Sequence, residues 1–477
     1  MFLKRKFLLI LFIGFLISST TSFLHLTKRD GDGMGQNLIW LQAEMISKDL
    51  KNGKNFFSSG GEYLRTYLAS RLLGIYSYLA EYELFENSSE SDFHKRQEAR
   101  IASLKGEYTD DTAKANLWQV NQGYGNLLYL ITQTLIYYLA LLFFYFKILK
   151  FFNFNKQKCF IILCFLALEP TIIQWHSSFW TESIFFSLQL ISLGLIIKKN
   201  KNIFHYLIIG LFIGLLYLQK TVAMFYIFLV ASYFFVSVKN KRIISIVSLF
   251  IGYLIILLFL GYHNYKRSGI FYIIPEQAKL AHYLYMVPQA LSKKNNISEK
   301  EVKRKKMESE SKWIIENNLN MNSEIDRMKL YQYKQKYAFK VMLDNPLITA
   351  EIYIKKIIHH GLLNPVQVYY WYNYHNKDYS RREEYHKSLD HKKWIWKRIL
   401  YSLFIYFFVI IGIFSSFKKK EYKNFNYFII LTVVYYILML GWMGNTRYFM
   451  PSFILTSIFF GEGIFVIFRR LIGRIHQ

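Results

Sequence analysis

The chain has 477 residues, of which 53% are hydrophobic and 19% are aromatic, and only 6 are prolines. Apolar runs of about 17–25 residues recur along it, each long enough to cross the ~30 Å hydrocarbon core of a membrane, which excludes an ordinary soluble globular protein. The formal net charge of +28 would indicate a nucleic-acid partner in a soluble chain. In a membrane protein, basic residues set the orientation and meet anionic headgroups, so we expect no nucleic-acid binding.

The apolar runs predict an all-α polytopic membrane protein with about ten transmembrane helices. The first, Phe7–Leu24, follows Lys4, Arg5 and Lys6. It resembles a signal peptide but has no small-residue cleavage site, so we interpret it as a retained anchor. The other predicted spans are Tyr124–Leu149, Cys159–Trp175, Trp180–Ile197, Tyr206–Leu218, Val222–Val238, Ile243–Tyr262, Ile399–Phe417, Tyr427–Met443 and Tyr448–Phe468.

The short connections between these spans differ in charge. KILKFFNFNKQK, KKNKN, KNKR, FKKKEYK and the terminal RRLIGR are basic, whereas HSSFWTES, LQKT and GNTRY are nearly neutral. Alternation along the spans puts every basic connection on the side of the N-terminus, as the positive-inside rule requires of the cytoplasm. The chain therefore divides into a first anchor (1–24), an outward segment (25–123), helices two to seven (124–263), a second outward segment (264–398) and helices eight to ten (399–477).

The first outward segment is predicted to hold an acidic turn and two helices that lie along the membrane surface. The turn is Asp30-Gly31-Asp32-Gly33, whose residue types tolerate tight geometry. NLIWLQAEMI and EYLRTYLASRLLGIYSYLAEYELF follow, with apolar residues at helical spacing. In the second of these, Arg65 and Arg71 lie beside the apolar face, where a guanidinium suits either the phosphate of a lipid-linked substrate or anionic headgroups.

The second outward segment is too polar to span a membrane and too regular to be disordered. A charged helix is predicted around 299–318, and the stretch RMKLYQYKQKYAFKVMLDNPLITAEIYIKKIIHHGLLNP follows it. We therefore expect a small outward helical domain. His359 and His360 are adjacent and point in different directions on a helix, which argues against a shared metal ion.

Ionisable and polar side chains gather at the outward ends of several predicted spans. They are Asp30, Asp32, His176, Glu182, Lys220, Arg447 and Tyr448. Because they come from four separate connections and face the same side, we interpret them as a candidate functional site.

Transfer from a lipid-phosphate donor is the chemistry that such a set fits. A carboxylate can remove the proton from an acceptor hydroxyl or amine as it attacks an anomeric carbon. Cationic and hydroxyl side chains can hold the departing phosphate, where negative charge accumulates in the transition state. Exclusion of water beside the membrane strengthens both effects.

Four stretches on this topology resemble the GT-C superfamily of polyprenyl-phosphate-sugar glycosyltransferases, in the branch of dolichyl-phosphate-mannose–protein mannosyltransferases and aminoarabinose transferases. They are the DGDG turn, LEPTIIQWHSSFWTESIF, GLLYLQKTVAMF and TRYFMPSFILTSIFFGEG, in that order along nearly the whole chain. FKVMLDNPLITAEIYIKK is also similar to the family's outward helix before its later spans. The resemblance implies a GT-C-like fold and an inverting sugar transfer from a polyprenyl-phosphate donor on the outer side.

The resemblance also implies roles for individual residues. Asp32 is the expected catalytic base, with Asp30 as the alternative. The substrate-binding residues are expected to be Arg65, Lys220 and Arg447 near the donor phosphate, Tyr448 beside them, and Glu182 and His176 in the same cavity. The chain departs from the family at Gln36, where a tyrosine is common, so the choice between the aspartates and the acceptor class stay open.

Two other functions remain open. An O-antigen ligase or polymerase would concentrate its catalytic residues in the second outward segment, at Arg381, Arg382, His359 and His386. A lipid or solute transporter would have internal repeats and ionisable groups or broken helices near the bilayer midplane. We find no internal repeat in the sequence, and Glu169-Pro170 is the nearest feature to such a break.

No cofactor is expected, and a divalent metal is not implied. The nucleotide-binding and zinc-protease motifs are absent, and the only two cysteines, Cys159 and Cys164, share one predicted span. The expected partners are the lipid-linked donor, a glycan, lipid or protein acceptor, and membrane lipids. The bias toward lysine, asparagine and isoleucine is typical of an AT-rich prokaryotic genome, so we expect a bacterial inner membrane with the site facing the periplasm.

Overall fold

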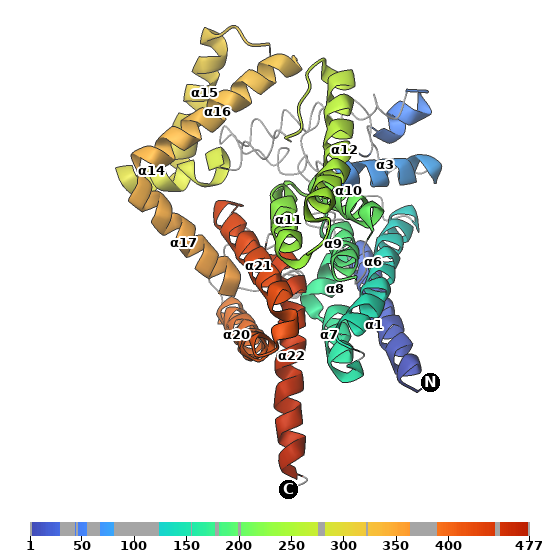
Figure 1. The fold of residues 1–477 in the computed structure, drawn as a ribbon. Helices are drawn as coiled ribbons and strands as arrows, with labels where there is room; N and C mark the ends of the chain where they lie inside the picture. Colours follow the sequence, from blue (N-terminus) through green and yellow to red (C-terminus); the bar gives the residue numbers. More distant parts are fainter. Residues whose placement is uncertain are drawn as a thin grey trace.

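A computed structural model describes residues 2–28, 43, 46–54, 67–80, 124–153, 155–176, 181–198, 202–274, 282–320, 323–362, 389–443 and 449–475. Within these ranges every regular element is a helix (Figure 1). The predicted all-α class is therefore confirmed for this part of the chain.

Five helices in the described ranges are long and apolar enough to cross a membrane, or six if one bent pair counts as a span. They are α1 (Phe2–Lys28), α6 (Tyr124–Phe151), α12 (Arg242–Ser268), α20 (Leu389–Phe417) and α22 (Met450–Ile475), and the bent pair is α7 (Lys156–Leu168) with α8 (Pro170–His176). The turn η2 (Lys420–Tyr422) and helix α21 (Lys423–Met443) connect α20 to α22. These helices support a membrane-embedded protein, since a helix satisfies its own backbone hydrogen bonds in lipid.

The prediction of ten full spans is wrong for the described residues. Helices do form at four further predicted positions. One is α21, which holds 21 residues. Of the other three, α9 (Glu182–Ile196) and α10 (Ile203–Gln219) hold only 15 and 17 residues. The third, α11 (Tyr226–Ser237), holds 12 residues after the short turn η1 (Thr221–Ala223). At about 1.5 Å per residue these three helices fall short of the ~30 Å hydrocarbon core. An apolar run shows that a helix is buried, and it does not show how much of the membrane that helix crosses.

The bend between α7 and α8 has a backbone cause. Pro170 has no N–H group, so the carbonyl groups one turn earlier lose a helical partner. The Tyr137 hydroxyl donates to the carbonyl oxygen of Leu166, and the Tyr138 hydroxyl donates to that of Ala167, each at 2.8 Å. These two tyrosines of α6 satisfy the carbonyl groups beside the break, and the two helices meet at 50°.

Two helix pairs pack so closely that their backbones meet. A methyl group at Gly210 of α10 would lie 2.0 Å from the Leu249 carbonyl oxygen of α12. One at Gly412 of α20 would lie 1.8 Å from the Phe459 carbonyl oxygen of α22. Because only glycine leaves room for this approach, these residues fix where the helices cross.

A second hydrophobic core lies in the segment after α12. Its helices are α14 (Val287–Asn295), α15 (Glu299–Glu316), α16 (Glu324–Asp344) and α17 (Pro346–Leu362). The core consists of Tyr283, Met286, Val287, Ala290, Ala338, Val341, Met342 and Ile352. Trp313 of α15 stacks on Tyr333 of α16 at 4.4 Å, and the two helices lie side by side in Figure 1. We call this group of four helices the α14–α17 unit.

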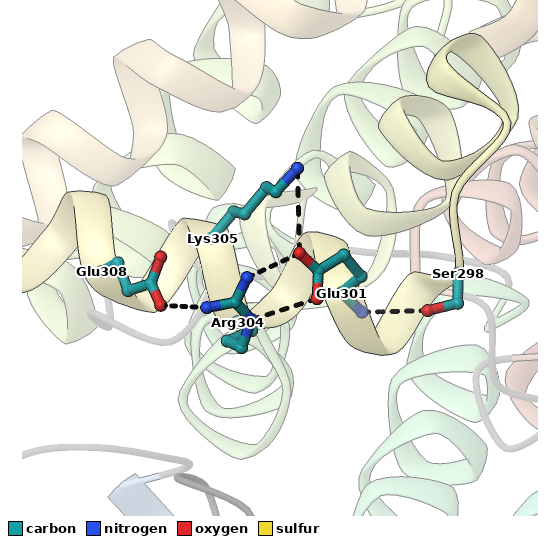
Figure 2. A network of polar contacts seen from close by, with 5 residues as sticks. All are labelled: Ser298, Glu301, Arg304, Lys305 and Glu308. Atoms are coloured by element: carbon teal, nitrogen blue, oxygen red, sulfur yellow. Dashed lines mark hydrogen bonds and ion pairs between the residues drawn. The ribbon is translucent and has the colours of Figure 1, made fainter.

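The polar face of α15 holds its own helix together. The Ser298 hydroxyl accepts from the Glu301 backbone N–H at 3.1 Å and caps the helix, as Figure 2 shows. Arg304 donates to both oxygens of Glu301, at 3.0 and 2.7 Å, and also to Glu308 at 2.5 Å. The guanidinium holds the pKa of Glu301 below its usual value by these hydrogen bonds. Pairs three and four residues apart are neighbours on a helix, so this charged run is explained as helix support.

Candidate functional site

A buried ion pair joins the connection before α9 to the end of α10. The Lys220 ammonium lies 2.5 Å from Glu182 Oε1, and their side chains are 3% and 0% exposed. Glu182 is the first residue of α9, where the helix N-terminus favours a carboxylate, and Lys220 follows the last residue of α10. Two distant connections therefore bring opposite charges together at one end of the bundle, which we call the Lys220 end.

A second contact holds the same two connections together. The Gln219 amide donates to the Thr181 carbonyl oxygen at 2.8 Å, and the Thr181 hydroxyl donates to Glu182 at 3.3 Å. Removing two charges from water is costly, and their attraction offsets that cost only where the geometry is good and further hydrogen bonds are made. Lys220 also lies over the Phe185 ring, 5.7 Å from its centroid. These contacts offset the cost of removing the Lys220 ammonium from water.

His176 contacts the residue that follows Glu182 in the chain. It is the last residue of α8 and is fully buried. Its Nδ1 atom is 3.0 Å from the hydroxyl of Ser183, the neighbour of Glu182, and its ring packs 3.7 Å from that of Tyr137. The Gln133 amide donates to the His176 carbonyl oxygen at 2.8 Å. Among the described residues, no group forms a hydrogen bond with the opposite ring nitrogen, Nε2.

Glu169 fixes the start of α8, the helix that ends at His176. Its carboxylate accepts from the Ile172 backbone N–H at 2.8 Å and from the Thr171 hydroxyl at 2.7 Å, which caps α8. The Tyr401 hydroxyl of α20 donates to it at 2.9 Å. A glutamate followed by a proline is a sequence pattern that predicts the start of a helix. Nothing in the sequence predicts the contact between Glu169 and α20.

A buried arginine lies at the same end of the bundle. Arg71 of α3 (Tyr67–Leu79) has its Nη2 atom 2.6 Å from Nε2 of His263 in α12, and the two residues are 3% and 0% exposed. Gly210 approaches Leu249 and Gly214 approaches Ile256, so α10 and α12 run in the same direction. His263, near the end of α12, therefore lies toward the Lys220 end. The helical spacing that places Arg71 beside an apolar face is the only sign of this pair in the sequence.

The described residues include three members of the predicted site: two contact each other, and the third, His176, contacts Ser183, the neighbour of Glu182 in the chain. They are His176, Glu182 and Lys220. The other predicted residues lie outside the described ranges: Asp30, Asp32, Arg65, Arg447 and Tyr448. The catalytic and substrate-binding roles of all eight stay predictions.

The residues of the ligase alternative are also mostly outside the described ranges. Arg381, Arg382 and His386 fall there. His359 lies in α17, where burial and the nearby charge of Arg398 lower its pKa. No group of three or more His, Cys, Asp or Glu side chains in the described ranges is placed to hold a metal ion.

Comparison with protein-family models, with curated proteins and with solved structures finds no match for this chain.

Proposed function

We propose that the protein is a membrane glycosyltransferase that moves a sugar from a polyprenyl-phosphate donor to an acceptor, with inversion at the anomeric carbon. The observation that carries the proposal is the buried Glu182–Lys220 pair beside His176, at one end of a bundle of apolar helices. A donor of this kind has an apolar tail that suits the membrane and an anionic phosphate that needs a cation at the membrane's edge.

Lys220 supplies that cation in the proposal. An ammonium has three N–H donors, and one of them goes to Glu182. Glu182 offsets the cost of burying the ammonium, because its carboxylate oxygen lies 2.5 Å from it. In the proposal this cation attracts the phosphate as negative charge develops on its oxygens.

The bond changes follow from this placement. The acceptor's oxygen or nitrogen attacks the anomeric carbon, and the bond from that carbon to the phosphate oxygen breaks with its electron pair leaving on the phosphate. The acceptor's proton passes to a carboxylate, for which the family resemblance points to Asp32 or, as the alternative, Asp30. We further propose that the site faces the periplasm of a bacterial inner membrane, because the basic connections then lie in the cytoplasm.

Turnover of a polyprenyl-phosphate sugar by the purified protein tests the proposal. Loss of the base is expected to lower the rate by about 10²–10⁴ in either Asp32→Asn or Asp30→Asn, and Lys220→Met is expected to lower it as well. Asp344→Asn, at an exposed carboxylate that ends α16, is the matched control and should keep the wild-type rate. Full activity in both Asp30 and Asp32 variants would exclude the general-base mechanism.

One feature favours transport as a second candidate. The α7–α8 break with the buried carboxylate of Glu169 has the form of the discontinuous helices that line transporter sites. However, the three donors to Glu169 are those of a helix cap and a neighbouring tyrosine, which explains the break as an element of the fold. Solute or lipid flux through protein-containing vesicles without any covalent product, abolished in Glu169→Gln, would establish transport instead.

A further inference from the structure

At the end of the bundle opposite Lys220, two connections pack together into one surface. The Asn153 amide, between α6 and α7, donates to Glu421 in η2 at 3.3 Å. Phe151 and Phe152 lie 5.1 and 5.3 Å from the Tyr422 ring. Residues far apart in the sequence, 150–153, 155–158 and 418–425, therefore form a single patch.

A buried carboxylate ties this patch to α22. Glu462 is fully buried, with the Lys158 ammonium 2.5 Å from Oε2 and the Lys419 ammonium 2.8 Å from Oε1. The Ser415 hydroxyl also donates to it at 2.8 Å. Lys158 is buried and lies over the Phe152 ring, whereas the Lys419 side chain is 44% exposed. One carboxylate thus holds two ammonium groups, and the second of them reaches the surface.

The patch carries a large excess of positive charge. Its exposed lysines are Lys150, Lys156, Lys418, Lys419, Lys420 and Lys423. Beside them the described residues of the two connections offer only Glu421 as an exposed carboxylate, since Glu462 is already shared between two lysines. We call these six lysines the basic platform.

The platform lies at the depth of lipid headgroups. The apolar stretch of α6 ends at Phe151 and that of α20 ends at Phe417. The lysines of the two connections begin within a few residues of both ends, among aromatic side chains that favour the membrane–water boundary. At that level the abundant anion is the phosphate of a phospholipid.

We propose that the basic platform binds the headgroups of anionic phospholipids, and that Glu462 fixes Lys419 so that the two connections bind as one surface. The charge excess and the depth carry this proposal, since basic patches between and beside transmembrane helices bind anionic headgroups. It does not depend on the proposed enzymatic activity.

The test uses the full-length protein purified in a neutral detergent. Its thermal unfolding midpoint is measured against added phosphatidylglycerol, phosphatidylcholine with the same acyl chains, or inorganic phosphate. Phosphatidylglycerol is expected to raise the midpoint, and the other two are not. In the variant Lys418→Gln/Lys420→Gln/Lys423→Gln the half-maximal phosphatidylglycerol concentration should rise at least about tenfold.

The matched control removes three exposed lysines from the α14–α17 unit, as Lys300→Gln/Lys303→Gln/Lys340→Gln. It should respond to phosphatidylglycerol as the wild-type protein does. An unchanged response in the platform variant, or an equal loss in the control, would overturn the proposal. An equal effect of inorganic phosphate would overturn its lipid part. If the triple platform variant does not fold, Lys418→Gln/Lys420→Gln gives the same comparison.

Discussion

At the scale of single residues, the Glu182–Lys220 pair makes the sharpest prediction. Lys220→Met leaves a carboxylate buried without the ammonium that faces it. Breaking such a pair from one side typically costs about 3–5 kcal/mol, because an uncompensated charge stays buried. We expect a much lower thermal unfolding midpoint for Lys220→Met, measured on purified protein in detergent.

The double variant Glu182→Gln/Lys220→Met separates this cause from lost packing. When both charges are removed, no uncompensated charge is left buried. The double variant should therefore be more stable than Lys220→Met alone. Equal instability of the two variants would show that Lys220 acts through its packing on Phe185 and not through its charge.

At the scale of elements, the glycines between paired helices decide how closely the helices approach. Gly412→Ala would place a methyl group 1.8 Å from the Phe459 carbonyl oxygen, so α20 and α22 would have to separate. We expect a loss of about 1–3 kcal/mol or more, as for other overpacked sites. Unfolding of Gly194→Ala is the comparison, because the atoms nearest to the methyl group there belong to the side chains of Phe143 and Lys147 and not to a backbone.

His282, which lies shortly before α14, predicts that the protein loses stability in acid. Burial, with the nearby charge of Lys356, lowers the pKa of His282 to about 4. An unfolded histidine titrates at about 6.5. Between these values the unfolded chain binds more protons than the folded one, so this stability is present above about pH 6.5 and falls as the pH drops toward 4, by at most about 1.4 kcal/mol per unit.

The measurement is the unfolding free energy between pH 7 and pH 5 for the wild-type protein and for His282→Gln. The window lies above the usual pKa of carboxylates, so histidines dominate it. The wild-type protein should lose stability more steeply than the variant as the pH falls. Parallel curves for the two proteins would show that His282 is not the group responsible.

At the scale of the whole molecule, the sequence predicts the long apolar helices better than the contacts between them. The spans around α1, α6, α12, α20 and α22 follow directly from apolar length. The local pattern does not show that α9 and α10 stop short, because a fully enclosed helix is as apolar as a spanning one.

The buried charges show the same limit more strongly. Glu182 and Lys220 stand out because each follows an apolar run, and the alternation of charge predicts that both face one side. Glu462 stands inside an apolar run, and nothing near it in the sequence indicates that Lys158 and Lys419 lie against it. Pairing between distant helices depends on packing angles, which no local pattern encodes.

The sidedness of the bundle yields the last prediction. The apolar stretch of α20 separates the α14–α17 unit, which precedes it, from Lys420, which follows it. The basic platform should lie in the cytoplasm by the positive-inside rule, and the α14–α17 unit should lie outside. In a chain carrying Cys159→Ala and Cys164→Ala, single cysteines at Lys303→Cys and Lys420→Cys report this. A membrane-impermeant maleimide added to spheroplasts should label Lys303→Cys at once and Lys420→Cys only after permeabilisation. The reverse order would show that the protein has the opposite orientation, with the proposed site away from the periplasmic face. Immediate labelling of both cysteines would show that α20 does not cross the membrane.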